Sequence, residues 1–286
     1  VNHQIDAYNE INFTGVGSID DFKVNALDEF DPEQQAIQDQ VPIIRQRTNT
    51  MGISWKKRFK NSSGFMITSL SNNVLNNNFS QYADNISQTG LYFSNDSREA
   101  ETKFRYALTK FTGAWIMSAG TSLQLSDYAN NTSNMVNGFQ YTSEIKFIRY
   151  GFFAQVSRKF LNDRLGFSTG LRTDGNSFTV TGNELNRTLS PRLSLSYQLD
   201  QAGRWTVNAA AGRYFKLPAY TILGFADAHG VLLNQDAEYI QSDHFVAGME
   251  YLLTESSRGL SSVCIQREEE YLVSLGLLTV TPVLYD

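Results

Sequence analysis

Hydrophobic and polar residues alternate one by one through many stretches of this chain. Positions 165, 167, 169 and 171 are Leu, Phe, Thr and Leu, and the positions between them and at 172 are Gly, Ser, Gly and Arg. The same period of two recurs in 100–111, 190–199, 204–215 and 241–253. Successive side chains of a β-strand point to opposite faces of its sheet, so each stretch predicts a strand with one apolar and one polar face.

Ten strands are predicted from this alternation and from the turn residues between the stretches. They cover residues 4–16, 48–59, 64–71, 100–111, 114–125, 140–158, 165–174, 190–199, 204–215 and 241–253. Within 140–158 the apolar residues change parity between Phe147 and Tyr150. We expect a β-bulge near Ile148–Arg149 to account for that change.

The connections between these strands alternate in length along the chain. The short connections are 60–63, 112–113, 159–164 and 200–203, and the long ones are 17–47, 72–99, 126–139, 175–189 and 216–240. In an up-and-down antiparallel sheet this places all long loops at one end, as in outer-membrane barrels with short periplasmic turns and long extracellular loops. The loops 17–47, 72–99 and 216–240 are therefore expected on the same side, and the Asn-rich run 71–78 is expected in a flexible loop.

Aromatic residues cluster near the short connections. The three tryptophans, Trp55, Trp115 and Trp205, all lie there, and so do Phe59, Phe65, Phe111, Phe160, Phe167 and Tyr197. Amphipathic rings favour the membrane–water interface, so this placement predicts an aromatic girdle. The alternative is the core of a soluble β-sandwich, whose strands also have two faces. In the membrane interpretation Leu165, Phe167 and Leu171 face lipid, whereas Arg172 and Asp174 face water.

Composition excludes several other classes. The chain has no apolar run of about 20 residues, which a membrane-spanning helix needs. The net charge of −5 gives no electrostatic case for nucleic acid. Cys264 is the one cysteine, and His3, His229 and His244 are far apart in sequence. With no nucleophile elbow either, we expect no enzyme, no catalytic or metal site and no cofactor.

Three segments taken in order resemble a known family. They read "YGFFAQVSRKFLNDRLGFSTGLRTDGNSF", "LSPRLSLSYQL" and "AAAGRYFKLPAYTILGF". Their order is similar to that in the barrel of TonB-dependent outer-membrane receptors, of the Bacteroidota type, and the resemblance covers about residues 1–253. It implies a barrel of about 22 strands filled by an N-terminal plug. The chain is then a partial barrel, which would suit the absence of a visible secretion signal and the start at Val1.

The same resemblance implies a function and partners. Such receptors lie in the outer membrane of Gram-negative bacteria and import scarce nutrients such as iron chelates, cobalamin or glycans. Outer-membrane lipid, the nutrient and the TonB complex are the implied partners, TonB acting through an N-terminal region not seen here. The sequence does not show which nutrient is carried or whether a surface lipoprotein covers the barrel.

The last part of the chain, residues 254–286, departs from the pattern. It holds Cys264, an acidic triplet at 268–270 and an apolar run at 271–278, and alternation stops. We expect either an altered reading frame or premature end, in which case this tail should pack poorly, or a genuine terminal segment.

Two groups of residues are candidate functional sites. Ligand contacts are expected from Tyr214, Phe215, Lys216 and Tyr220, whose other interpretation is an outer girdle and a packed loop base. Plug contacts in the lumen are expected from Lys103, Arg105, Arg172, Asp174, Arg192 and Glu250. Two other functions stay open: a passive porin or adhesin-like barrel, and a soluble β-sandwich that binds carbohydrate.

Overall fold

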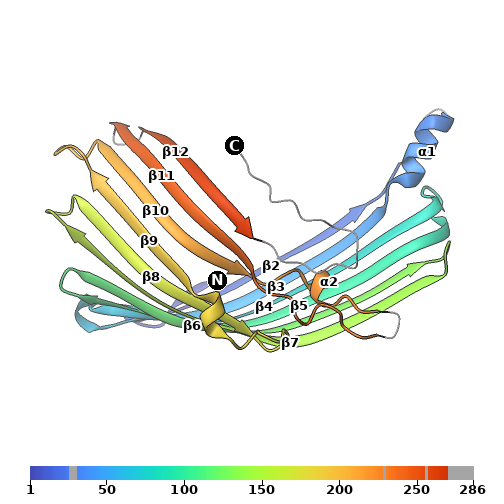
Figure 1. The fold of residues 1–286 in the computed structure, drawn as a ribbon, viewed down its shortest axis with the longest axis horizontal. Coiled ribbons are helices and arrows are strands. Elements are labelled where there is room, and N and C mark those ends of the chain that lie inside the picture. Colours follow the sequence, from blue (N-terminus) through green and yellow to red (C-terminus); the bar gives the residue numbers. More distant parts are fainter. Residues whose placement is uncertain (26–30, 228–229, 255–256, 270–286) are drawn as a thin grey trace.

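One antiparallel sheet contains almost all of the regular structure. The computed structural model describes residues 1–25, 31–227, 230–254 and 257–269. Twelve strands lie side by side in chain order, each antiparallel to the next (Figure 1). They are β1 Asn2–Gln4, β2 Asn9–Phe22, β3 Ile43–Arg58, β4 Gly64–Asp84, β5 Thr89–Thr112, β6 Trp115–Asn134, β7 Phe139–Phe160, β8 Leu165–Asn176, β9 Ser190–Gln198, β10 Trp205–Lys216, β11 Ile240–Thr254 and β12 Ser257–Glu269.

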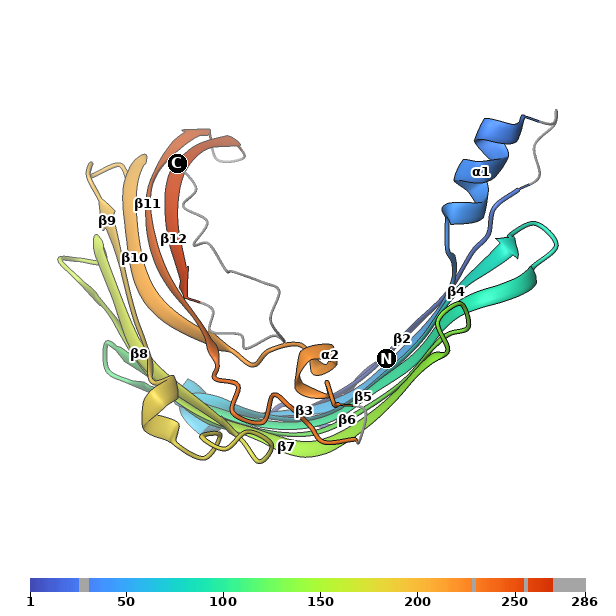
Figure 2. The same cartoon turned by 45° about the vertical axis from the view of Figure 1, so that its right-hand side comes forward.

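The sheet curves into a trough whose concave side holds a short helix. That helix is α2 (Tyr220–Leu223), and Figure 2 shows it inside the curve. Helix α1 (Pro32–Gln40) stands at the end of the β2–β3 connection, and two 3₁₀ turns, η1 (Lys60–Ser62) and η2 (Leu185–Thr188), lie in other connections. Among the described residues, no helix has the length and apolar character to cross a membrane.

Helix α1 begins at a capping aspartate and is held by a neighbouring turn. Asp31 accepts hydrogen bonds from the backbone N–H groups of Glu33 and Gln34. At the other end of the helix, the Asn85 side chain donates to the carbonyl groups of Gln38 and Val41, both at 2.7 Å. These bonds tie the β2–β3 connection to the β4–β5 turn.

The strand order confirms the predicted placement of the connections. In an unbroken antiparallel order, the connections β2–β3, β4–β5 and β10–β11 leave from one end of the sheet, and β3–β4, β5–β6, β7–β8 and β9–β10 from the other. The prediction that loops 17–47, 72–99 and 216–240 lie on the same side of the sheet is therefore confirmed.

The predicted lengths of two loops, however, are wrong. Most of 72–99 and of 126–139 is strand, because β4 continues to Asp84, β5 begins at Thr89 and β6 continues to Asn134. The asparagines of the 71–78 run form cross-strand bonds: Asn72 Nδ2 donates to Thr102 Oγ1 (2.9 Å), and Asn78 Nδ2 donates to Asp96 Oδ1 (2.6 Å). Where both faces of a hairpin meet water, polar residues are favoured on both. Such strands therefore lack the alternation of apolar and polar residues from which the other strands were predicted.

The convex face of the sheet is apolar and uncovered. Leu193, Leu195 and Leu199 are 42%, 39% and 49% exposed, so no second sheet packs on them. Their cross-strand neighbours on the same face include Phe167 and Ala209. The β-sandwich alternative is therefore wrong, and the all-β, up-and-down, antiparallel barrel wall is confirmed.

Aromatic residues mark the short-turn end of this convex face. The register places Trp55, Trp115 and Trp205 on it. The centroids of the Trp115 and Phe160 rings are 6.2 Å apart, and the Arg158 guanidinium lies 4.9 Å from the centroid of the Trp115 ring. Phe65 and Phe111 were expected in the same girdle, but their strand parity places them on the concave face, 6.2 Å from each other.

Charged residues mark the opposite end of the apolar band. On β6 the band runs from Trp115 to Leu125, a span that fits the roughly 9–11 residues of a tilted spanning strand. The next outward residue is Asp127, which lies 3.7 Å from Arg98 and 3.9 Å from Lys146. The ion pair Arg213–Asp243 (2.8 Å) follows the apolar band in the same way on β10 and β11.

The expected bulge near Ile148–Arg149 is absent from the structure. The β6–β7 register continues without a shift through Leu125–Ile148 and Gln124–Arg149. The apolar parity changes because Ile145 and Phe147 point to the concave face, where other residues bury them, whereas Phe152 points to the convex face. The parity therefore changes at the point along β7 beyond which the concave face is covered by other residues and the convex face is polar.

Strand β12 lies in the segment that was expected to leave the pattern. Residues Ser257–Glu269 pair with β11, so the strand pattern does not stop at residue 253. The apolar run at 271–278 lies outside the described residues, and the division into residues 1–253 and 254–286 stays a prediction.

Candidate functional site

The β10–β11 connection folds into the concave side of the sheet. We call its described part, residues 217–227 and 230–239, the inward segment. Its α2 helix packs on β6 and β7 through an apolar cluster in which Leu223 is 0% and Tyr220 8% exposed. The members of the cluster are Tyr128, Ile145, Phe147, Leu217, Tyr220 and Leu223, with Phe178, Leu232, Ala237 and Tyr239 at its margin. Burial of these side chains holds the segment against the wall.

A polar network fixes the ring of Tyr220 in that cluster. Its hydroxyl group is within hydrogen-bond distance of the Glu101 carboxylate and lies 3.1 Å from Ser126 Oγ. The Gln124 side-chain amide donates to the same hydroxyl oxygen at 3.3 Å. Burial raises the pKa of the Tyr220 hydroxyl, and the Glu101 charge adds to that rise. The phenol therefore stays protonated and donates one hydrogen bond at neutral pH.

The backbone after α2 is tied to β7 as well. The carbonyl oxygen of Gly224 accepts hydrogen bonds from the Tyr141 hydroxyl, at 2.6 Å, and from the Ser143 hydroxyl. The Tyr141 hydroxyl in turn accepts from the backbone N–H of Ala226 at 3.0 Å. These bonds satisfy polar backbone groups that would otherwise be buried without partners.

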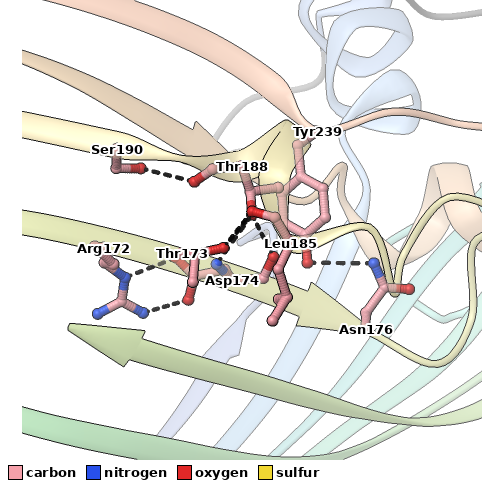
Figure 3. Close-up of polar contacts among 8 residues, drawn as sticks. All are labelled: Arg172, Thr173, Asp174, Asn176, Leu185, Thr188, Ser190 and Tyr239. Atoms are coloured by element: carbon pink, nitrogen blue, oxygen red, sulfur yellow. Dashed lines mark hydrogen bonds and ion pairs between the residues drawn. The ribbon is translucent and has the colours of Figure 1, made fainter.

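The β8–β9 connection joins the inward segment at the same end of the sheet. Thr173 Oγ1 donates to the Leu185 carbonyl (2.6 Å), and Asn176 Nδ2 donates to the Tyr239 hydroxyl oxygen (3.2 Å), as Figure 3 shows. Arg187 also forms an ion pair of 2.7 Å with Glu238. The β8–β9 and β10–β11 connections are therefore bonded to each other, and together they occupy part of the space on the concave side of the sheet.

A charged pocket of about 250 Å³ lies below this structure. Arg172 and Asp174 pair inside it, with 2.7 Å between Nε and Oδ2 (Figure 3). The pair occupies space that a side chain at position 151 would need, because a Cβ atom on Gly151 would collide with Asp174 Oδ1. The pocket is lined by Glu101, Lys103, Arg105, Ser122, Gln124, Arg149, Tyr150, Arg172, Asp174, Gly175 and Tyr239. A neighbouring hollow of about 390 Å³ shares Arg105 and Arg172 and adds Arg192 and Tyr214.

The structure brings most of the predicted lumen residues together. Lys103, Arg105, Arg172 and Asp174 surround the charged pocket, and Arg192 lines the adjoining hollow. Glu250 is also on the concave face, but it pairs in register with Thr206 near the short-turn end and lines neither space.

The predicted ligand contacts are divided between the two faces. Tyr214 and Lys216 have concave parity, and the Tyr214 ring lies between the Arg192 guanidinium (4.5 Å) and the His244 ring (4.8 Å). Phe215 has the opposite parity and lies on the convex face, which favours its other interpretation as part of an outer girdle. Tyr220 is on the concave side but inside the apolar cluster.

The residues of the charged pocket that sequence reasoning missed include Arg149 and Tyr239. Arg149 was assigned to a bulge, and Tyr239 is brought in only by the fold of the inward segment. Arg149 could have been predicted from the strand register, which aligns Lys103, Gln124 and Arg149 across β5, β6 and β7. That register can be derived from the sequence only if the ends of the strands are predicted correctly. Within the described ranges, no group of three or more His, Cys, Asp or Glu side chains could hold a metal ion.

Solved structures that align with this chain include an outer-membrane receptor, a copper transporter and a siderophore receptor. The alcaligin outer-membrane receptor FauA from Bordetella pertussis aligns with a TM-score of 0.64 at 10% identity, over 93% of this chain and 42% of that one. The copper transporter OprC aligns with a TM-score of 0.67 at 11% identity, over 93% and 43%. The siderophore receptor PirA from Pseudomonas aeruginosa aligns with a TM-score of 0.63 at 13% identity, over 97% and 46%. The chain thus spans less than half of each of these proteins.

The family assignment rests on the sequence itself. No curated protein matches the chain. A family model described as "TonB dependent receptor-like, beta-barrel" matches residues 3–254. That match covers most of the chain and includes strands β2 to β11. This chain therefore belongs to the TonB-dependent receptor-like β-barrel family.

Proposed function

We propose that this chain forms part of the wall of an active importer in the outer membrane of a Gram-negative bacterium. The observation that carries the proposal is the opposite chemistry of the two faces of a single curved sheet. The convex face is an uncovered apolar band that ends in tryptophans on one side and ion pairs on the other. The concave face carries charged side chains around a pocket. Lipid outside and water inside satisfy both faces.

The direction of transport follows from the two ends of the sheet. The long connections would face the cell exterior and the short turns the periplasm, as in other outer-membrane barrels. A nutrient arriving from outside would then meet the inward segment first and the charged pocket below it. Tyr214 and Lys216 are candidate ligand contacts, since both lie on the concave face at the end of β10.

Family membership supports the proposed partners. In the whole protein a plug would fill the lumen, and TonB would supply energy from the periplasmic side. The candidate plug contacts are Lys103, Arg105, Arg172, Asp174, Arg192 and Glu250. Iron chelates, cobalamin and glycans are the candidate nutrients, and a surface lipoprotein is a further candidate partner. The proposed role is binding and transport, without catalysis.

The test is energy-dependent uptake by cells that produce the protein. Cells with and without the gene would be given radiolabelled ferric chelates, cobalamin and glycans, each with and without a proton uncoupler. We expect one class of nutrient to accumulate only when the gene is present and the uncoupler is absent. Accumulation that ignores the uncoupler would instead identify a passive porin, and no accumulation of any nutrient class would contradict import.

A further inference from the structure

We propose that Lys103, Arg105 and Arg149, with the Tyr239 hydroxyl, form a binding site for an oxyanion, a carboxylate or phosphate group held in the lumen. The proposal rests on the proposed function only in taking the concave face as the lumen. The four side chains line the same pocket of about 250 Å³. Neither a plug nor a particular nutrient is needed to define the site.

The register explains why these side chains converge. Lys103, Gln124 and Arg149 occupy one row across β5, β6 and β7 on the concave face. The Lys103 and Arg149 backbones are therefore about 10 Å apart, two strand spacings. Both side chains line the pocket together with Gln124. Arg105 lies on the same face two residues farther along β5, opposite Ser122. A concave sheet brings such side chains closer together than a flat one.

The carboxylates of the pocket are already engaged. Asp174 pairs with Arg172, and Glu101 accepts a hydrogen bond from Tyr220. In the part of the chain that the structure describes, Lys103, Arg105 and Arg149 have no ion pair. Arg172 and Asp174 offset each other, and Glu101 is a single carboxylate beside Lys103, Arg105 and Arg149. The pocket therefore keeps a surplus of positive charge, whose mutual repulsion a bound anion would reduce.

Tyr239 supplies a neutral donor at the rim of the pocket. Its hydroxyl oxygen accepts from Asn176 Nδ2 at 3.2 Å, and no acceptor for its own proton lies among the described residues. Burial raises the pKa of this hydroxyl, so it stays protonated at neutral pH. A phenol beside two guanidinium groups and an ammonium group suits an oxygen anion, since charge-assisted bonds to carboxylate or phosphate are strong and Arg binds them with two donors. Four cationic side chains face two carboxylates in this pocket, so its net charge favours an anion over a cation.

The anionic group could come from a free solute or from a carboxylate of the same protein. Citrate would be titrated calorimetrically, at low ionic strength, into protein purified from outer membranes in detergent. The variants are the double substitution Lys103→Gln with Arg149→Gln, and the single Arg105→Gln, in case the double variant fails to fold. Lys159→Gln is the matched control, because it removes one positive charge from the concave parity of β7 outside the pocket.

If a free solute is bound, wild type and the control bind citrate, and the pocket variants bind it at least tenfold more weakly. If an internal carboxylate fills the site, wild type does not bind citrate, but the pocket variants melt at least about 4 °C below wild type and the control does not. Citrate binding that the pocket variants leave unchanged would overturn the site. So would the absence of citrate binding together with pocket variants that melt at or above the wild-type temperature. Uptake in cells is measured separately, so its failure would not affect these outcomes.

Discussion

The hydroxyl group of Tyr220 is hydrogen-bonded to the carboxylate of Glu101, a residue 119 positions earlier in the chain. This contact joins the inward segment to β5, although the segment leaves the sheet between β10 and β11. It shows that the connection packs against the concave face of the sheet, and it holds the segment there by a specific polar contact.

Replacing Tyr220 with Phe should loosen the inward segment. The change leaves Glu101 and Gln124 without a hydrogen-bond partner that they have in the native protein, which costs about 1–3 kcal/mol. We expect the backbone amides of residues 217–227 to exchange hydrogen about 5- to 150-fold faster, as measured by mass spectrometry. Tyr214→Phe is the matched control, because no hydrogen bond of its hydroxyl lies among the described residues, and it should leave those amides unchanged.

Replacing Leu223 with Ala should free the segment more completely. Leu223 is fully buried, and removing such a side chain typically costs about 2–5 kcal/mol. Limited proteolysis of the protein in detergent should then cut within 217–239, where the wild type resists. Ile222→Ala, at a partly exposed position of the same helix, should stay far more resistant. Equal cleavage of both variants would show that the apolar cluster does not hold the segment.

A lysine should be tolerated on one face of β9 and rejected on the other. Leu195 is on the convex face near the middle of the apolar band, whereas its neighbour Ser196 is on the concave face. Leu195→Lys should lower the free energy of unfolding in lipid by about 2–4 kcal/mol. Ser196→Lys adds the same charge where water reaches it and should cost much less. Denaturant titration in vesicles would measure both, and equal costs would argue against a lipid-facing Leu195.

The carboxyl group of Glu99 predicts a pH dependence. It lies on the concave face beyond the apolar band, and burial, with a contribution from the Glu101 charge, raises its pKa above 4.5. The folded protein therefore binds this proton more tightly than the unfolded chain does. Stability from this group is fully present below pH 4.5 and is lost as the pH rises through the raised pKa.

Glu99→Gln should accordingly raise the melting temperature at pH 7 to 8 and have little effect at pH 4. Glu144→Gln serves as the contrast, since the hydrogen bond from Lys146 lowers the pKa of Glu144. Its substitution should not stabilise the protein at pH 7. Melting curves of the detergent-solubilised protein across this pH range would show the difference, and a Glu99→Gln variant less stable than wild type at pH 8 would contradict the assignment.

The features that were predicted correctly from the sequence are those set by the alternation of apolar and polar residues within a single strand. The parity of Leu193 and Leu195, the outward tryptophans and the order of the hairpins all follow from a period of two where one face meets lipid. The prediction failed where that constraint ends. The Asn-rich part of β4 lies beyond the apolar band, and its side chains bond across strands instead of alternating.

The site was predicted only in part for a related reason. Lys103, Arg105 and Arg172 were identified because each is a charged residue on the polar face of a strand whose other face is apolar. Arg149 was missed because Ile145 and Phe147 lie on the same face of β7, which made that face look apolar. These two residues are apolar because the inward segment covers them. The packing of the inward segment on β7 and the position of Tyr239 in the pocket both depend on contacts between residues far apart in the chain. Neither can be predicted from the pattern of neighbouring residues.

The central claim is that this sheet separates lipid on its convex face from water on its concave face. It is tested most directly by spin labels at successive positions 192–198, introduced one at a time after Cys264 is replaced by Ser, in protein reconstituted into vesicles. We predict that labels at 193, 195 and 197 collide mainly with oxygen, which concentrates in lipid, and labels at 192, 194, 196 and 198 mainly with a water-soluble nickel complex. Labels that collide with neither reagent at 193, 195 and 197, or accessibility without a period of two, would contradict the claim.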